Sequence, residues 1–192
     1  FHTLRCLEQI RMDIGEMKFP VRMVGLSSGV VLGMIGNMHC SFEDISIIRS
    51  IPNITIISPA DSFELVKVLK ALDNYKEPVY LRLTGGAPLP VIYHDDYELQ
   101  IGKAITLKEG SDIAIISTGT INEQAMKAAL LLEEQGFSVE VINLHTIRPL
   151  DMEMVERVFK SKKLVVTVEE HVTTGGLGGA ISEASALILN KA

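Results

Sequence analysis

The chain has no tryptophan, only two cysteines, and fewer basic than acidic residues (18 against 24). Cys6 and Cys40 are too few for a disulfide framework in a chain of this size, which favours free thiols in a reducing cytoplasm. A formal net charge of −6 argues against the basic surface with which nucleic-acid-binding proteins neutralise phosphates. Long apolar runs are also missing, although a membrane-spanning helix needs about 20 apolar residues. We therefore expect neither a nucleic-acid nor a membrane partner.

What is present is the composition of an ordinary globular protein, with 47% apolar and 22% charged residues. The 192 residues leave room for one large domain or two small ones, each with its own core. The chain begins with Phe1 and enters a helical pattern at once, without a visible signal peptide. We expect it to be a fragment of a longer cytoplasmic protein.

The most distinctive stretch is a glycine-spaced loop, residues 25–44, which follows a short apolar run and carries His39 towards its end. Glycine lets another molecule approach the backbone closely. In α/β proteins, ligands bind in loops at the carboxyl ends of buried strands. We interpret residues 25–44 as a ligand loop around His39. A solvent loop with an incidental histidine is the alternative.

Hydrophobic periodicity predicts alternating helices and strands in the first half of the chain. Apolar residues three and four apart predict a helix over residues 3–14, ended by Gly15. Ser41 begins an S-x-x-D helix start, and Asp61 opens a further helix. Short apolar runs predict buried strands at residues 21–24, 54–58 and 79–83. This alternation favours a parallel sheet with right-handed crossovers.

Residues 85–101 break this rhythm with two prolines and an acidic pair, and we interpret them as a partly ordered interdomain linker. Beyond the linker the alternation of strands and helices resumes. Strands are predicted at residues 113–117, 138–143 and 164–169, and helices at residues 122–135, after Asp151 to residue 160, and up to about residue 189. The predicted fold class is α/β, with two three-layer α/β/α units and mainly parallel sheets.

A second glycine-rich loop covers residues 169–179. Its G-G-x-G at residues 175–178 matches neither the dinucleotide fingerprint nor a P-loop, so it predicts a tight turn that packs the last helix closely on its strand. His145 and His171 are expected at the carboxyl edge of the second sheet. They either serve catalysis or face a partner, and Glu169 and Glu170 are candidates for orienting His171.

The sequence resembles the transketolase family across its whole length. The resemblance is carried by the segments TLRCLEQIRMDI, GNMHCSFEDISIIRSIPNITIISPAD, EPVYLRL, STGT, INLHTIRPLD and VEEHVTTGGLGGAISE. It implies that residues 1–84 are the later part of a pyrimidine-binding domain, residues 85–101 a linker, and residues 102–192 the C-terminal domain. The resemblance extends, less closely, to deoxyxylulose-phosphate synthase and to the beta subunit of 2-oxoacid dehydrogenases.

Proteins of this family bind thiamine diphosphate between two domains, usually from different subunits. The resemblance implies that Phe1 and Arg5 contact the cofactor. It implies that His39 is catalytic and binds the substrate, hydrogen-bonding a sugar hydroxyl or oxyanion, and that Asn37 is a second substrate contact. It assigns no metal ligand to this chain, because the diphosphate and magnesium site is expected in an N-terminal part. That part is either the first half of the same protein or a separate subunit, and the assembly is expected to be a homodimer.

The implied function is transfer of a two-carbon ketol unit between sugars, by a fragment that is inactive alone. Polar positions of the family pattern are altered, however. Ile35 replaces a loop acid, Ser27 and Ser28 stand at polar or basic positions, and Gly85 replaces the arginine that commonly grips a sugar phosphate. An ordinary sugar phosphate is therefore expected to bind poorly. The alternatives are a deoxyxylulose-phosphate synthase or 2-oxoacid dehydrogenase beta subunit, and a non-catalytic dimerisation module.

Overall fold

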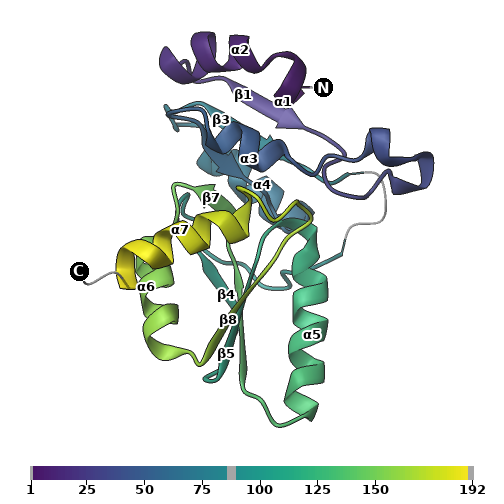
Figure 1. Cartoon of the computed structure of the whole chain (residues 1–192), viewed down its shortest axis with the longest axis vertical. Coiled ribbons are helices and arrows are strands. Elements are labelled where there is room, and N and C mark those ends of the chain that lie inside the picture. The colour runs from purple at the N-terminus through teal and green to yellow at the C-terminus, as the bar shows by residue number, and fades with distance from the viewer. Residues whose placement is uncertain (1, 86–89, 190–192) are drawn as a thin grey trace.

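The chain folds into two four-stranded sheets, each covered by helices on both faces (Figure 1). The computed structural model describes residues 2–85 and 90–189, so the predicted role of Phe1 lies outside the described residues. The first sheet lies in the upper half of Figure 1 and the second sheet in the lower half. The predicted fold class, two mainly parallel three-layer α/β/α units, is confirmed.

The first sheet has the strand order β1 (Arg22–Gly25), β3 (Val79–Arg82), β2 (Thr55–Ile57) and β7 (Thr146–Arg148). Strand β3 pairs in parallel with both β1 and β2, as expected for strands joined by helical crossovers. Strand β7 comes from the second half of the chain and pairs antiparallel with β2. The sequence analysis missed β7, and the first sheet is therefore completed by residues far away in the sequence.

Helices cover both faces of the first sheet, because successive side chains of its strands point to opposite sides. On β2, Ile56 packs with the isoleucines of α3 (Asp44–Arg49), whereas Ile57 packs with Val68 of α4 (Ser62–Ala71). The predicted helix over residues 3–14 is three consecutive helical segments in the structure. These are α1 (His2–Arg5), α2 (Leu7–Gln9) and the π-helical η1 (Ile10–Glu16). Gly15, expected to end that helix, lies inside η1.

The second sheet has the strand order β4 (Ile105–Lys108), β6 (Val139–Asn143), β5 (Ile113–Ser117) and β8 (Leu164–Val168). Strand β5 is parallel to both β6 and β8, while β4 is antiparallel to β6 and was not predicted. The exposed fractions of its side chains show why β4 was missed: it lies at the sheet edge and none of its residues is fully buried. The three predicted strands of this half are confirmed.

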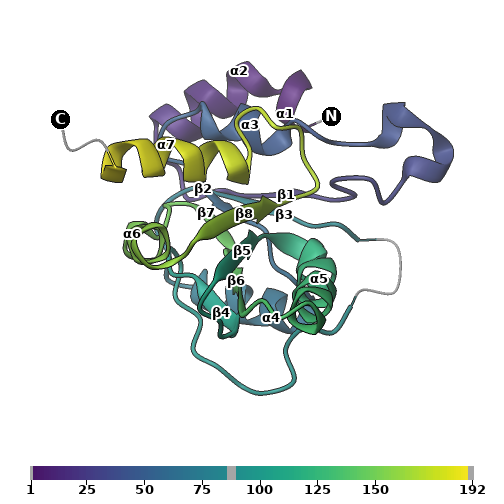
Figure 2. The same ribbon diagram turned by 60° about the horizontal axis from the view of Figure 1, so that its bottom comes forward.

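The helices of the second sheet lie where the periodicity predicts them. Helix α5 (Asn122–Glu134) packs on one face, and α6 (Met152–Ser161) and α7 (Leu177–Leu189) pack on the other. Figure 2 shows α7 lying along the junction of the two units, above β8 and beside α3. Its Ala180 is part of the core of the first unit. Helix α7 therefore joins the two cores.

Two predicted helix caps are confirmed and one is wrong. The Asp61 carboxylate accepts the Glu64 N–H at 2.8 Å, and the Asp151 carboxylate accepts the Met154 N–H at 3.1 Å. Ser41 does not open a helix, because α3 begins at Asp44 and has no capping side chain of its own. The Asp44 carboxylate points instead into the sheet, where it pairs with Arg82 of β3.

The linker carries no helix or strand in its described part, residue 85 and residues 90–101, and carboxylates of the first unit bind its backbone and side chains. The backbone N–H groups of Ile92 and Tyr93 donate to Asp61 at 2.8 and 3.0 Å. Glu64 accepts the hydroxyls of Tyr93 and Tyr97 and the amide of Asn143 on β6. Burial raises the pKa of the Glu64 carboxyl. The linker is thus held between the two units.

Within residues 2–85 and 90–189, no helix combines the length and the apolar character that crossing a membrane requires.

Candidate functional site

A cavity of about 470 Å³ opens at the carboxyl end of β1, the edge where parallel sheets place their ligand sites. Three parts of the chain line it: α1, the glycine loop from Gly25 to Glu43, and Tyr80 of β3. The lining residues are Thr3, Leu4, Arg5, Gly25, Leu26, Ser27, Leu32, Met38, His39, Cys40, Ser41, Glu43 and Tyr80. The structure therefore brings Arg5 and His39, two of the predicted site residues, to one cavity.

His39 ends η3 (Asn37–His39), the second of two short 3-10 turns in the glycine loop; the first is η2 (Gly33–Ile35). The base of the loop is closed by a pair of backbone hydrogen bonds between Gly29 and Ser41, at 2.9 and 3.2 Å. Gly29 has a φ of +69° and Gly36, between the two turns, a φ of +103°. Residues with side chains rarely adopt such angles, so these two glycines are required for the shape of the loop.

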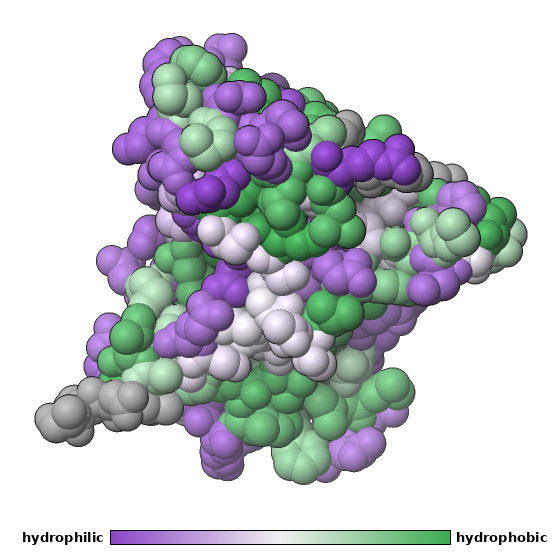
Figure 3. Space-filling model, turned by 45° about the horizontal axis from the view of Figure 1, so that its top comes forward, coloured by the Kyte–Doolittle hydropathy of each residue, from purple (hydrophilic) through white to green (hydrophobic). Residues whose placement is uncertain are grey.

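The tip of the loop projects from the body of the molecule, as Figures 1 and 2 show. Met34 and Met38 are 93% and 94% exposed, and Ile35 is also exposed. Figure 3 shows hydrophobic residues at this projecting end and on the adjoining face. Asn37, the predicted second substrate contact, is exposed on η3 and does not line the cavity. Exposed methionines at such a tip are typical of a surface that packs against another chain.

A buried ion pair lies behind the cavity. Asp44 Oδ2 accepts Arg82 Nε at 2.8 Å and the Tyr80 hydroxyl at 2.9 Å, and all three side chains are buried. Burial and the Asp44 charge raise the pKa of Tyr80, so its hydroxyl stays protonated and donates. Because Tyr80 also lines the cavity, the pair fixes one of its walls. Sequence reasoning missed Asp44 and Arg82 as a pair, because they lie 38 positions apart.

The two other histidines considered from the sequence do not line this cavity. His171 Nε2 accepts the Ser46 N–H at 3.3 Å, and its Nδ1 lies 2.8 Å from the Val172 carbonyl. Glu169, a candidate from the sequence for orienting His171, has other partners. Its carboxylate accepts the Leu177 and Gly178 N–H groups at the start of α7, at 2.7 and 2.8 Å. This carboxylate fills the position that a bound phosphate would take, which agrees with the prediction of a structural turn.

His145 is fully buried at the end of β6, with Nδ1 2.8 Å from the Thr146 hydroxyl. Its Nε2 has no hydrogen-bond partner among the described residues. Burial lowers the pKa of His145 from 6.5 to about 4. The imidazole is therefore neutral at physiological pH.

The buried His145 should make the protein sensitive to acid. The pKa of His145 is lower in the folded than in the unfolded state. The free energy of unfolding should therefore have its full value above pH 6.5 and decrease as the pH falls from 6.5 to 4. The expected loss is roughly 3 kcal/mol. Urea unfolding measured at several pH values in this range gives the free energy of unfolding as a function of pH. This free energy should change less with pH in His145→Gln than in the control His94→Gln, which replaces an exposed histidine. Equal slopes would contradict the assignment.

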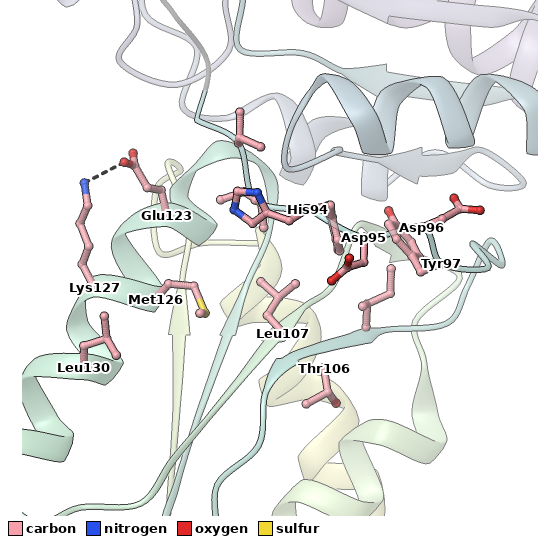
Figure 4. Close-up of a pocket in the computed structure, with 14 residues that line it drawn as sticks. His94, Asp95, Asp96, Tyr97, Thr106, Leu107, Glu123, Met126, Lys127 and Leu130 are labelled. Carbon is pink, nitrogen blue, oxygen red and sulfur yellow. Dashed lines mark hydrogen bonds and ion pairs between the residues drawn. The ribbon is translucent and has the colours of Figure 1, made fainter.

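A second cavity, of about 490 Å³, lies between the linker, β4 and α5 (Figure 4). Leu107, Met126 and Leu130 line its apolar part, while His94 and Asp95 come from the linker. On its rim, Lys127 Nζ pairs with Glu123 at 2.8 Å on consecutive turns of α5. None of the predicted site residues lines this cavity, so the cavity at His39 is the candidate functional site.

An α/β protein with a histidine-bearing glycine loop over the carboxyl end of a parallel sheet belongs to a class that binds small ligands at that edge. Comparison with protein-family models identifies the family of this chain. Transketolase, pyrimidine binding domain, matches residues 1–87, and Transketolase, C-terminal domain, matches residues 102–190. The chain belongs to the transketolase family.

Individual relatives agree with this assignment. The chain is 38% identical over 184 residues to a subunit of the apulose-4-phosphate transketolase of Phocaeicola vulgatus, covering 95% of this chain and 59% of the relative. It is 39% identical over 179 residues to 1-deoxy-D-xylulose-5-phosphate synthase of Carboxydothermus hydrogenoformans, covering 93% of this chain and 29% of the relative. A solved structure, a split gene transketolase described as an inactive beta4 tetramer, has a TM-score of 0.88 at 30% identity, covering 97% of this chain and 59% of that chain. The chain thus spans less than two thirds of these relatives.

The cavity fits one part of the cofactor that the family uses. Its apolar residues Leu4, Leu26 and Leu32 suit a planar heterocycle, and Arg5 and His39 add polar groups. The diphosphate of the cofactor is bound together with a metal ion, which requires metal-ligating side chains. Across the part of the chain that the structure describes, no three His, Cys, Asp or Glu side chains are grouped so that they could hold a metal ion. The lining of the cavity therefore suits the heterocycle of thiamine diphosphate.

Proposed function

We propose that this chain is the C-terminal part of a transketolase-like transferase that moves a two-carbon ketol unit between sugars. The observation that carries the proposal is the cavity shared by Arg5 and His39 in a member of the transketolase family. Residues 1–84 would form the later part of the pyrimidine-binding domain, residues 85–101 the linker, and residues 102–192 the C-terminal domain.

Within this function, thiamine diphosphate supplies the carbon nucleophile that takes up the ketol unit. His39 would hydrogen-bond the sugar hydroxyl or oxyanion at the cavity and take part in proton transfer. Arg5 and Phe1 would contact the heterocycle, and Asn37 would approach the substrate from the exposed loop.

The rest of the site is proposed to come from a part of the enzyme outside residues 1–192. The relative from P. vulgatus is named as one subunit of its transketolase, and the similar solved structure is described as a beta4 tetramer. We propose a separate subunit, or an N-terminal half, that holds the diphosphate and magnesium, together with a homodimer of this chain in the cytoplasm. The exposed Met34, Ile35 and Met38 give the loop an apolar surface suited to such contacts.

The chain alone should bind thiamine diphosphate and magnesium weakly, because the described residues lack a metal-holding group. Isothermal titration should give a dissociation constant above the micromolar range for this chain, and tighter binding once the N-terminal part is added. Micromolar binding by the chain alone would show that the diphosphate site lies within it.

The function is tested by ketol transfer in the assembled enzyme, meaning this chain with the part that holds the diphosphate. A panel of phosphorylated and unphosphorylated ketoses would identify the donor. The similarity to 1-deoxy-D-xylulose-5-phosphate synthase favours a second candidate, in which pyruvate is the donor. Consumption of pyruvate in place of ketoses would contradict ketol transfer between sugars and support a deoxyxylulose-phosphate synthase or a 2-oxoacid dehydrogenase beta subunit. Cofactor binding without either reaction would favour a non-catalytic dimerisation module.

A further inference from the structure

Three residues of the second unit contact the chain on both sides of the His39 loop. They are residues 170–172, named here the clamp segment, which lies between β8 and α7. The Glu170 carbonyl accepts Arg82 Nη2 at 2.9 Å, the His171 ring accepts the Ser46 N–H, and the Val172 N–H donates to the Phe42 carbonyl at 2.9 Å. The clamp segment is therefore bonded to β3 and to the start of α3.

The clamp segment also lies against the beginning of the loop. A Cβ atom at Gly29 would come within 2.9 Å of Glu170 Cβ, so the two residues are in close contact. Gly29 is paired through its backbone with Ser41, and Phe42 follows directly. One short segment of the second unit thus contacts both the entry and the exit of the loop that carries His39.

His171 makes the most specific of these contacts. The first N–H groups of a helix have no partner within the helix. In α3, Glu43 stands at the capping position and its side chain does not cap. The carbonyl of Val172 can only accept, so Nδ1 of His171 carries the ring proton, and Nε2 is left to accept the Ser46 N–H. His171 therefore caps α3 from another unit.

We propose that the clamp segment sets the position of the His39 loop and that His171 is a positioning residue for His39. The catalytic part of this inference rests on the proposed function. The structural part does not depend on that function: the closed base of the loop and the start of α3 are held by the second unit, while the tip, residues 33–38, projects outwards. The loop can then keep its base in place and still adapt its apolar tip to a partner chain.

The test compares His171→Ala, His171→Gln and the control His94→Ala in the assembled enzyme, with His94 chosen as an exposed histidine of the linker. Hydrogen exchange is measured first, because it does not depend on activity. Loss of one hydrogen bond should speed exchange at the amides of Gly29, Ser41 and Ser46 by roughly two- to tenfold in His171→Ala. The amides of the second sheet should be unchanged. His171→Gln, which retains an acceptor, should restore most of the protection.

Kinetics supply the second measurement. His171→Ala should lower kcat for ketol transfer with little change in KM, and His171→Gln should recover it. If exchange at these three amides is unchanged, or if exchange is equally faster over the whole chain, the clamp segment does not hold the base of the His39 loop. Local loosening with an unchanged kcat would overturn the positioning role of His171. If the wild-type enzyme transfers no ketol unit, the proposed function is wrong. The hydrogen-exchange result still tests whether the clamp segment holds the base of the loop.

Discussion

The His39→Ala variant of the assembled enzyme should transfer ketol units with a kcat/KM roughly 10²- to 10⁴-fold below that of the wild type, the usual contribution of a positioned acid or base. The reason is its position: His39 lines the cavity with Arg5, on a loop whose base is closed by Gly29 and Ser41. Steady-state kinetics with the ketose identified in the panel measure the effect.

Two variants separate catalysis from folding. His94→Ala removes an exposed histidine of the linker and should leave the rate unchanged. His39→Gln keeps a hydrogen-bonding group and should retain part of the substrate binding while losing proton transfer, so its KM should change less than its kcat. A wild-type rate in His39→Ala would remove His39 from the site and favour the interpretation of residues 25–44 as an ordinary surface loop.

The Asp44→Ala variant should lose about 3–5 kcal/mol of the free energy of unfolding. Asp44 and Arg82 are 1% and 2% exposed, and Tyr80 donates to the same carboxylate oxygen. Removing the carboxylate leaves a buried guanidinium without its counter-charge and a buried hydroxyl without its acceptor. Urea unfolding of the chain, followed by circular dichroism, measures the loss.

Matched variants test whether burial causes this effect. Glu183 also pairs with an arginine, Arg49, at 2.6 Å, but its side chain is 67% exposed. Glu183→Ala should therefore cost less than about 1 kcal/mol. Asp44→Asn keeps an acceptor for Tyr80 and should fall between the two alanine variants. Equal losses in Asp44→Ala and Glu183→Ala would show that the buried pair contributes no more than a surface pair.

Much of the fold could be predicted because its signals are local. Isoleucine-rich runs such as residues 113–117 mark strands buried on both faces, and the period of apolar residues marks α5. Asp61 and Asp151 were recognised as helix starts because a cap requires only a carboxylate three residues before a free N–H. The candidate loop was also found locally, from its glycine spacing and from His39.

The errors fall where distant residues decide the outcome. Ser41 and Asp44 have the spacing of a helix start, but Arg82 on β3 takes the Asp44 carboxylate, and no local pattern records that. His171 was considered for catalysis, and its partner Ser46 lies 125 positions away. Strand β4 is an edge strand without buried residues, so its sequence lacks the apolar run of its neighbours. Predictions on Phe1, Arg5, Asn37 and His39 as site residues remain to be tested.

Strand β7 bears on how this protein could be recombined with its relatives. Its residues belong to the C-terminal half of the chain, yet they form the outer edge of the first sheet through the pairing of Arg148 with Ile56. A chimera joined in the linker would combine a β2 from one parent with a β7 from the other. Unless their side chains match, β2 is left as an open edge, a site where chains aggregate. Functional chimeras should therefore inherit residues 55–57 and 146–148 from the same parent.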